Sequence, residues 1–368
     1  MGRRPFARGG SPIAIEHLRL AGGAGDVPAI ERAAEALRSG ALVAFPTETV
    51  YGLAANADLP EAVDRLYEAK GRDRSKPCTV MIADRGSAER LAAGAAGEIP
   101  RVAAKLMRIY WPGPLTIVVG SGAGAIGMRL PADRRARALV SAAGVPVLAP
   151  SANRSGEPEP RSGDDVIAQL GDAVDVLLDG GEISGGVPST VVMVDGEEAH
   201  IVRAGAIEPE EVLGATLMMV LFVCRGNSCR SPMAEVVFER ELAKRLSAAG
   251  RSDELRRWRV ISAGTDSPSG SAAHERARQA VEEAGLDLSG HKPRSLTVDA
   301  IDKADLIFTM EGRQRDSILG IVPDAAGKVM LLDPRGGEIA DPAGNSIASY
   351  RLCRDKIADC VRRRVEEL

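Results

Sequence analysis

The sequence predicts an α/β fold in two domains, and three observations lead to this prediction. The chain has 368 residues, which exceeds the length of most single domains. Short apolar runs typical of buried strands alternate with longer helical patterns, as in α/β layers. Met218-Met219 stands directly before a new apolar strand, as at the start of an independent protein. The domain boundary is therefore expected between about residues 210 and 218.

The first domain is expected over residues 28–213, behind an N-terminal tail over residues 1–27. A helix is predicted over residues 60–69, and Pro or Gly separates most of the apolar runs, as turns require. The predicted strands are Ala41–Phe45, Thr79–Ile82, Leu115–Val119, Val145–Leu148, Val174–Leu178 and Thr190–Val194.

The second domain is expected over residues 219–368. Its strands are predicted at Val220–Val223, Arg259–Ser262, Leu306–Met310 and Val329–Leu332. Its helices are predicted over residues 232–246, 272–284 and 346–366. Four short apolar strands with interleaved helices predict a doubly wound, four-stranded parallel sheet.

Composition limits the classes of function. The net charge is −4 and aromatic residues make up 3% of the chain, which disfavours a protein that coats nucleic acid or stacks its bases. Five irregularly spaced cysteines do not suggest a secreted disulfide framework, and no apolar run reaches membrane-span length. The sequence has neither a signal-peptide pattern nor the Cys and His spacing of a metal site. We expect a cytoplasmic protein without membrane contact and without a metal held by protein ligands.

Residues 220–235 contain the strongest candidate site. A buried strand ends at Cys224, a tight loop follows, and a helix is expected to start at Ser231-Pro232, because Ser is a preferred N-cap. The loop N–H groups and the positive helix end form an anion cradle that favours the thiolate of Cys224. Arg230 supplies a bidentate fork for phosphate oxygens. The other phosphate-loop residues are Arg225, Gly226, Asn227, Ser228, Cys229 and Ser231.

This loop resembles the active-site loop of the low-molecular-weight protein-tyrosine phosphatase family. The similarity extends over residues 219–368, through Ser-Ala-Gly-Thr at 262–265 and the stretch Gly-His-Lys-Pro-Arg-Ser-Leu-Thr from Gly290. The resemblance implies that Cys224 attacks the phosphorus of a phosphoprotein and forms a phosphocysteine intermediate. Within the loop, Gly226 is expected to permit the tight turn, while Asn227 and Ser231 hydrogen-bond within the loop or to the sulfur.

The resemblance also implies an acid that protonates the leaving group, on an Asp-Pro loop before the last helix. Two pairs fit this description, Asp333-Pro334 and Asp341-Pro342. We assign Asp341, since the residues that follow it match the family: Gly344, Ser346, Tyr350 and Cys353. Such an acid contributes on the order of 10²–10⁴-fold in rate.

Two positions leave the phosphatase substrate open. Ala343 stands where the family usually has an aromatic residue that stacks on phosphotyrosine, and Ser228 is small where tyrosine-selective members carry a bulky apolar residue. Both features resemble the protein-arginine phosphatases of this family, so phosphotyrosine and phosphoarginine both remain candidates. Cys229 is either a packed small residue or the partner of a reversible disulfide with Cys224.

The first domain carries four polar clusters at predicted strand ends, where α/β sheets usually bind phosphate. Lys70, Arg72 and Lys76 lie within seven residues and could grip a triphosphate. The sequence has no Gly-rich Walker loop, so the residues alone predict an anion-binding domain without P-loop chemistry. The clusters are Phe45 to Leu53, Lys70 to Pro77, Trp111 to Thr116, and Pro150 to Asn153 with the later Ser189-Thr190 and Arg203.

The order and spacing of these clusters resemble the YrdC-type threonylcarbamoyl-AMP synthase family across about residues 28–207. The resemblance implies a twisted mixed sheet with helices, and synthesis of threonylcarbamoyl-AMP and pyrophosphate from L-threonine, bicarbonate and ATP. ATP with Mg²⁺ on its phosphates is then a substrate, and no tightly bound cofactor is expected. The product serves threonylcarbamoyl modification of tRNA, so tRNA is expected to be contacted only weakly or through downstream enzymes.

The resemblance assigns residues by position. Thr49 and Arg129 are expected to contact threonine. The residues expected to bind ATP are Lys70, Arg72, Lys76, Thr116, Ser151, Asn153, Thr190 and Arg203. Met81 replaces a His that some members have near the threonine, and Glu159 replaces a common Ser. An alternative hypothesis makes this domain a catalytically silent RNA-binding or regulatory module, but its intact Lys-Gly-Arg and Ser-Ala-Asn clusters favour catalysis.

Overall fold

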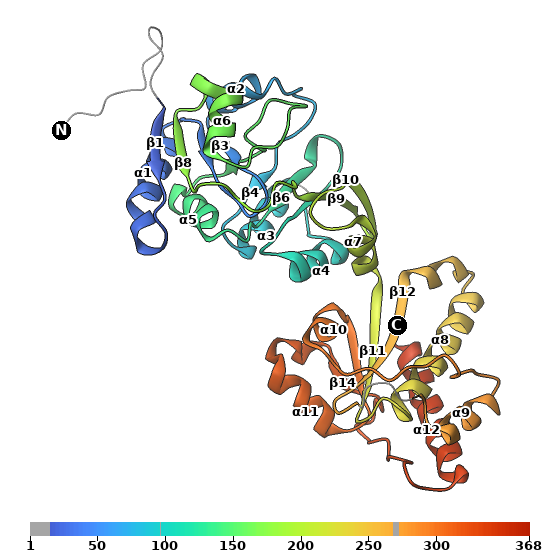
Figure 1. Ribbon diagram of the computed structural model, residues 1–368. Coiled ribbons are helices and arrows are strands. Elements are labelled where there is room, and N and C mark those ends of the chain that lie inside the picture. The colour runs from blue at the N-terminus through green and yellow to red at the C-terminus, as the bar shows by residue number, and fades with distance from the viewer. Residues whose placement is uncertain (1–14, 96, 268–271) are drawn as a thin grey trace. The chain divides into compact units, whose positions relative to one another are not determined.

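The computed structural model of the chain describes residues 15–95, 97–267 and 272–368. It divides into two compact units, Met1–Ala215 and Thr216–Leu368 (Figure 1). Both units combine a β-sheet with packed helices, so the predicted α/β fold class is confirmed. In the part of the chain that the structure describes, no helix combines the length and apolar character needed to traverse a membrane.

The first unit is built on a ten-stranded mixed sheet with the order β1-β8-β2-β3-β7-β4-β6-β5-β9-β10. Parallel and antiparallel pairs both occur: β5 runs parallel to β9 and antiparallel to β6. The strands are β1 (Glu16–Arg19), β2 (Val43–Phe45), β3 (Gly52–Asn56), β4 (Val80–Met81), β5 (Leu115–Val119), β6 (Ile126–Arg129), β7 (Val147–Leu148), β8 (Val176–Asp179), β9 (Thr190–Asp195) and β10 (Glu198–Arg203).

Helices cover both faces of this sheet. The alternation of side chains along β2 shows this, because Val43 and Phe45 join the core under α1 and α5, whereas Ala44 joins the core under α2 and α6. The helices are α1 (Val27–Arg38), α2 (Pro60–Lys70), α3 (Arg85–Ala95), α4 (Arg101–Tyr110), α5 (Arg134–Ala143), α6 (Gly163–Leu170) and α7 (Pro209–Thr216).

Part of the predicted tail belongs to the fold. Residues Glu16–Arg19 form β1, which pairs in parallel with β8, so this segment of the predicted tail is part of the sheet. Residues 1–14 of the predicted tail lie outside the described residues. Sequence patterns also missed β3, β6 and β10, because these strands lack the run of large apolar residues from which other strands were predicted.

The second unit has a four-stranded parallel sheet with the order β12-β11-β13-β14, as predicted. Its strands are β11 (Met218–Cys224), β12 (Trp258–Gly264), β13 (Leu306–Thr309) and β14 (Val329–Leu331). Its helices are α8 (Arg230–Ala248), α9 (Glu275–Glu282), α10 (Val298–Lys303), α11 (Gly312–Ile321) and α12 (Ile347–Glu366). Of these, α10 and α11 were not predicted.

Helices α8, α9 and α12 pack on one face of this sheet, and α10 and α11 pack on the other (Figure 1). The strand β11 shows why, since Phe222 enters the first core and Leu221 and Val223 enter the second. With β12 on one side of β11 and β13 on the other, the strand order reverses at β11. Ligands of doubly wound sheets bind at this switch point, beyond the carboxyl ends of the strands.

Candidate active sites

A cavity of about 620 Å³ lies over one face of β5, β6, β9 and β10 in the first unit. Side-chain alternation places it there, because Thr116 and Val118 of β5 line the cavity while Ile117 is buried in the core behind the sheet. Loop residues complete the walls: Thr47, Val50, Arg72, Ser75 to Thr79, Ala149 to Ser151, Pro188 and Ser189. The cavity therefore has an apolar and hydroxyl-lined floor with loops around it.

The charge of the cavity is positive. Among the described residues that line it, four are cationic and none is acidic: Arg72, Lys76, Arg129 and Arg203. Arg72 also braces its own loop, because its Nε donates to the backbone oxygen of Lys76 over 2.9 Å. Arg203 donates to the backbone oxygen of Ser189 over 2.7 Å and to its Oγ over 3.2 Å. A group of cations at this density favours a polyanionic ligand such as a triphosphate.

Arg129 is oriented by the polar turn after β2. Its Nη2 donates to Glu48 Oε1 over 2.6 Å and to Thr49 Oγ1 over 3.0 Å, and its Nε donates to the backbone oxygen of Gly113. Burial would raise the pKa of Glu48, but the charge of Arg129, its hydrogen bond and the backbone hydrogen bonds together outweigh burial and hold this pKa below its ordinary value. Thr49 itself does not line the cavity, although it touches Arg129, which does.

Five of the eight residues predicted to bind ATP line the cavity: Arg72, Lys76, Thr116, Ser151 and Arg203. The other three are buried behind its wall. Thr190 exchanges hydrogen bonds with the backbone of Ile207, and the Lys70 ammonium donates to Ser151 and Asn153. These three residues hold the loops that border the cavity.

Two further residues near this cavity were noted in the sequence but were not assigned to the site. Ser189 lies in the wall, where its hydroxyl is 2.8 Å from Thr116 Oγ1. Its position beside Thr190, at the start of β9, could have identified Ser189 as a site residue from the sequence. Glu159 has one buried carboxylate oxygen, Oε2, which lacks a hydrogen-bond partner among the described residues. Its charge acts on Lys70 and Arg203, and this coupling cannot be read from the sequence.

In the second unit, Cys224 ends β11 at the switch point, and it is 3% exposed. The backbone N–H of Asn227 donates to its Sγ over 3.3 Å, and Ser231 Oγ lies 3.0 Å from the same sulfur. A backbone N–H and a hydroxyl thus face the sulfur at the start of α8. This arrangement leaves the helix end free to bind an oxyanion beside the sulfur.

The loop owes its shape to Asn227 rather than to Gly226. Asn227 has a φ of 51°, in the left-handed region, whereas Gly226 does not have a positive φ. The buried Asn227 amide donates to Ser231 Oγ and Ser262 Oγ over 3.0 and 2.8 Å, and its Oδ1 accepts from the Arg294 backbone. The helix also starts earlier than predicted, at Arg230, because the Ser231 hydroxyl serves the loop instead of capping the helix.

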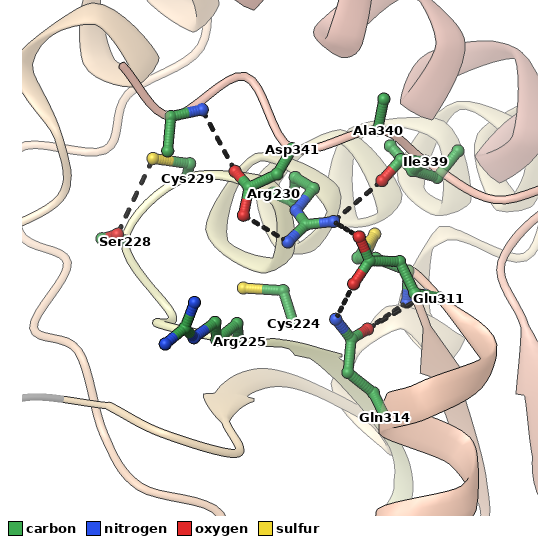
Figure 2. A network of polar contacts seen from close by, with 12 residues as sticks. Cys224, Arg225, Ser228, Cys229, Arg230, Glu311, Gln314, Ile339, Ala340 and Asp341 are labelled. Carbon is green, nitrogen blue, oxygen red and sulfur yellow. Dashed lines mark hydrogen bonds and ion pairs between the residues drawn. The ribbon is translucent and has the colours of Figure 1, made fainter.

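Arg230 is almost completely buried, with 1% of its side chain exposed. Its Nη1 donates to Glu311 Oε1 and to the backbone oxygen of Ile339, both over 2.8 Å, and its Nη2 donates to Asp341 Oδ2 over 2.6 Å (Figure 2). The prediction named Arg230 and Asp341 but missed Glu311. Glu311 lies two residues after the end of β13, the strand beside β11, and this shared sheet edge was the signal that could have found it.

The two Asp-Pro pairs have different surroundings. Asp341 contacts Arg230, and its Oδ1 accepts a hydrogen bond from the backbone of Ala343 over 3.1 Å. Asp333 is buried, accepts from the backbone of Arg335 over 3.0 Å, and pairs with Lys356 on α12. Only Asp341 of the two therefore touches the side chains around Cys224.

The remaining loop residues lie at the rim or in the core. Arg225 is exposed and pairs weakly with Asp266 at 3.3 Å. Ser228 Oγ lies 3.7 Å from Cys229 Sγ, and that buried sulfur lies 3.8 Å from Tyr350 Oη. Burial raises the pKa of the Cys229 thiol, which favours its neutral form. Cys229 is free in this structure, as are the other four cysteines.

Two family models match the chain, one in each unit. The Sua5/YciO/YrdC model, described as "Telomere recombination", matches residues 35–205. The model described as "Low molecular weight phosphotyrosine protein phosphatase" matches residues 219–368.

Individual relatives agree with these matches. The threonylcarbamoyl-AMP synthase of Bacillus subtilis (strain 168) is 39% identical over 196 residues, which cover 50% of this chain and 56% of the synthase. The chain thus spans about half the length of this relative. A shorter protein of Mycobacterium tuberculosis (strain H37Rv) is 36% identical over 50% of this chain and 89% of its own. The protein-arginine-phosphatase of Geobacillus stearothermophilus is 33% identical over 40% of this chain and 95% of its own.

Some solved structures match most of the chain, and one of them reaches a TM-score of 0.50. A doubly substituted Sua5 of Pyrococcus abyssi aligns with 94% of this chain and 97% of its own, with a TM-score of 0.50 and 23% identity. At this level of identity, the agreement concerns the fold alone.

Proposed function

Because residues 35–205 belong to the Sua5/YciO/YrdC family and residues 219–368 belong to the low molecular weight phosphotyrosine protein phosphatase family, we propose that the chain is an enzyme with two independent active sites. The first site makes threonylcarbamoyl-AMP. The second removes phosphoryl groups from proteins. Each proposal rests on the site geometry of its own unit, and the two are tested separately.

The observation that carries the synthase proposal is the cavity with four cationic residues and no acidic residue in its described lining. L-Threonine and bicarbonate give N-carboxythreonine with loss of water, and its carboxylate oxygen attacks the α-phosphorus of ATP. The bond to the departing pyrophosphate breaks, and Mg²⁺ enters and leaves with the phosphates. Arg72, Lys76 and Arg203 are placed to neutralise the phosphate charge, since each lines the cavity.

Arg129 is placed to bind the threonine carboxylate. Glu48 and Thr49 fix its Nη2, and Gly113 fixes its Nε, so the guanidinium is held before any ligand arrives. Such fixation reduces the entropy lost on binding. We propose the product for tRNA modification, with tRNA reached through downstream enzymes.

Pyrophosphate release that requires both L-threonine and bicarbonate tests this proposal. In Lys76→Ala, the KM for ATP is expected to rise about 10- to 100-fold, since a charged hydrogen bond contributes about 1.5–3 kcal/mol. Arg74→Ala is the matched control, because Arg74 lies on the same loop but pairs with Asp64 and does not line the cavity. Pyrophosphate release without threonine would reject the synthase. No release, with tRNA binding retained in Lys76→Ala, would support the silent RNA-binding module instead.

The observation that carries the phosphatase proposal is the Cys224 sulfur held between the Asn227 N–H and the Ser231 hydroxyl. The sulfur attacks phosphorus, the bond to the leaving group breaks, and Asp341 gives that group a proton. Asp341 then takes a proton from water as the water attacks phosphorus. The P–S bond breaks, which releases inorganic phosphate and restores the thiolate.

We propose phosphoarginine protein as the first substrate to test. Ser228 of the phosphate loop and Ala343, two residues after Asp341, are both small, and the relative from Geobacillus stearothermophilus is named as a protein-arginine-phosphatase. Phosphotyrosine protein is the second candidate, since the family model carries that description.

Side-by-side hydrolysis of phosphoarginine and phosphotyrosine proteins separates the two substrates. Wild type is expected to prefer phosphoarginine, and Ser228→Ile is expected to shift preference toward phosphotyrosine because a branched apolar side chain narrows and desolvates the entrance. An unchanged ratio in Ser228→Ile would show that Ser228 does not set selectivity. A wild type that cleaves only phosphotyrosine protein would reject the first candidate.

A further inference from the structure

The buried guanidinium of Arg230 donates hydrogen bonds to two carboxylates, one from each terminal nitrogen. Glu311 accepts from Nη1, which also donates to Ile339, and Asp341 accepts from Nη2 (Figure 2). The two carboxylates enter from different segments, Glu311 from the start of α11 and Asp341 from the loop before α12. The family resemblance gives Asp341 the role of the acid, whereas it gives Glu311 no role.

Glu311 is held much more firmly than Asp341. Its Oε2 accepts from Arg313 Nε over 2.6 Å and from Gln314 Nε2 over 2.8 Å, in addition to the bond from Arg230. Gln314 is itself fixed, since its Oε1 accepts from the backbone N–H groups of Met310 and Glu311 over 3.0 Å. The Glu311 side chain is 13% exposed, against 35% for Asp341. The start of α11 thus holds Glu311 as a fixed acceptor.

We infer that Glu311 is the positioning residue of the phosphatase site, which holds Arg230 by Nη1 and leaves its opposite edge for the phosphoryl group. This inference rests on the proposed phosphatase function. A guanidinium binds phosphate in a bidentate manner through one edge, here Nε and Nη2. Among the described residues, none accepts a hydrogen bond from Arg230 Nε. Asp341 holds only Nη2, and it has to release that nitrogen when phosphate binds.

Charge balance explains why the two carboxylates have different tasks. Arg230 with Glu311 and Asp341 has a net charge of −1, and Arg313, which pairs with Glu311, brings the group to zero. The four side chains therefore offer no net positive charge to an incoming phosphate dianion. Burial would raise the pKa of Glu311, but the hydrogen bonds from Arg230 and Arg313 outweigh it and keep this pKa below its ordinary value. Glu311 therefore remains an anion, and Asp341, which is more exposed and has fewer side-chain partners, is the carboxyl that can leave the guanidinium. The proton that reaches the leaving group then comes from Asp341.

Two variants of the full chain test this inference. Glu311→Gln removes the charge but keeps an oxygen that can accept from Arg230, and Glu311→Ala removes both. Glu338→Gln is the matched control, because Glu338 is an exposed carboxylate that accepts from the Gly312 N–H at the start of the same helix and does not touch Arg230. Binding of inorganic phosphate and vanadate is measured by calorimetry, and kcat and KM are measured with p-nitrophenyl phosphate.

The expected order is wild type and Glu338→Gln first, then Glu311→Gln, then Glu311→Ala. Vanadate affinity and kcat/KM should fall about 10-fold in the Gln variant and about 100-fold in the Ala variant, because preorganised contacts to transition-state charge are lost. The partial rescue by Gln distinguishes positioning from folding, as does an unchanged melting temperature. If Glu311→Gln binds oxyanions as tightly as wild type or more tightly, Glu311 acts only as a repulsive charge and the inference is overturned.

The binding measurement keeps this inference distinct from the proposed function. If wild type binds vanadate but hydrolyses no phosphate ester, the phosphatase proposal fails, while the order of vanadate affinities still decides the task of Glu311. If wild type binds neither vanadate nor phosphate, Arg230 does not serve an oxyanion site and the inference fails with it.

Discussion

The ammonium group of Lys70 donates a hydrogen bond to the backbone oxygen of Asn153 over 2.7 Å and another to its side-chain oxygen over 3.1 Å. A third bond goes to the backbone oxygen of Ser151, so all three N–H donors are used within the protein. Ser151 lines the cavity, whereas Lys70 is 2% exposed and does not. Lys70 therefore supports, from behind, the loop that borders the cavity.

Lys70 gives the first unit a measurable pH dependence. Burial lowers the pKa of Lys70 from 10.5 to about 8. Between these two values the unfolded chain holds a proton that the folded chain has lost, so this group makes the fold more stable as pH rises from about 8 to 10.5. Relative to that of Lys70→Met, the free energy of unfolding of wild type should rise by roughly 2 kcal/mol between pH 7.5 and pH 9.5.

Urea unfolding followed by Trp111 fluorescence checks this value. A Trp258→Phe background leaves Trp111 as the one tryptophan and so confines the signal to the first unit. Lys76→Met serves as the control, because Lys76 is exposed on the nearby loop and should show no such difference. If the free energies of unfolding of wild type and Lys70→Met differ by the same amount across this pH range, the pKa of Lys70 is not lowered by folding.

The two chemistries should be separable by single substitutions. Cys224→Ser removes the nucleophile and should abolish phosphatase turnover, while pyrophosphate release stays at the wild-type rate. Arg72→Ala should lower pyrophosphate release about 10- to 100-fold through lost phosphate contacts and leave phosphatase turnover unchanged. Both activities are measured on each purified full-length variant. Loss of both activities in either variant would contradict two independent sites.

The sequence predicted the elements that contain runs of apolar residues, and it predicted the loop whose residue types are constrained by chemistry. The β11 strand, Cys224, Arg230 and the parallel sheet follow from apolar runs and from a short segment. Glu311 lies 81 positions from Arg230, and only the folded sheet brings them together. Lys70 was predicted as a ligand because a cation beside Arg72 has the same pattern whether it faces a cavity or a loop.

Gly264 should be essential to the phosphate loop because the loop backbone packs directly on it. A Cβ at Gly264 would lie 2.6 Å from the backbone oxygen of Arg225 and 2.9 Å from the backbone nitrogen of Asn227. Backbone atoms cannot move aside cheaply, so Gly264→Ala should displace the loop at a cost of about 1–3 kcal/mol. Phosphatase kcat/KM should fall about 10- to 100-fold, since small misplacements of reacting groups are costly.

Gly290→Ala is the control for Gly264→Ala. A Cβ at Gly290 meets nothing within 4 Å, and this glycine does not have a positive φ. Phosphatase turnover of Gly290→Ala should therefore match wild type, and pyrophosphate release should be normal in both variants. Wild-type phosphatase kinetics in Gly264→Ala would show that the loop tolerates displacement.

Asp341 and Asp333 precede prolines in the same part of the chain, but their contacts predict opposite effects of substitution. Asp341→Asn removes the proton donor and should lower kcat about 10²- to 10⁴-fold for a phosphate ester with a poor leaving group. The loss should shrink with p-nitrophenyl phosphate, whose leaving group needs less protonation. Asp333→Asn should instead keep the dependence on leaving group while it lowers stability by about 1–3 kcal/mol, since buried Asp333 pairs with Lys356. If Asp333→Asn alone changes the slope of rate against leaving-group pKa, the acid has been assigned to the wrong loop.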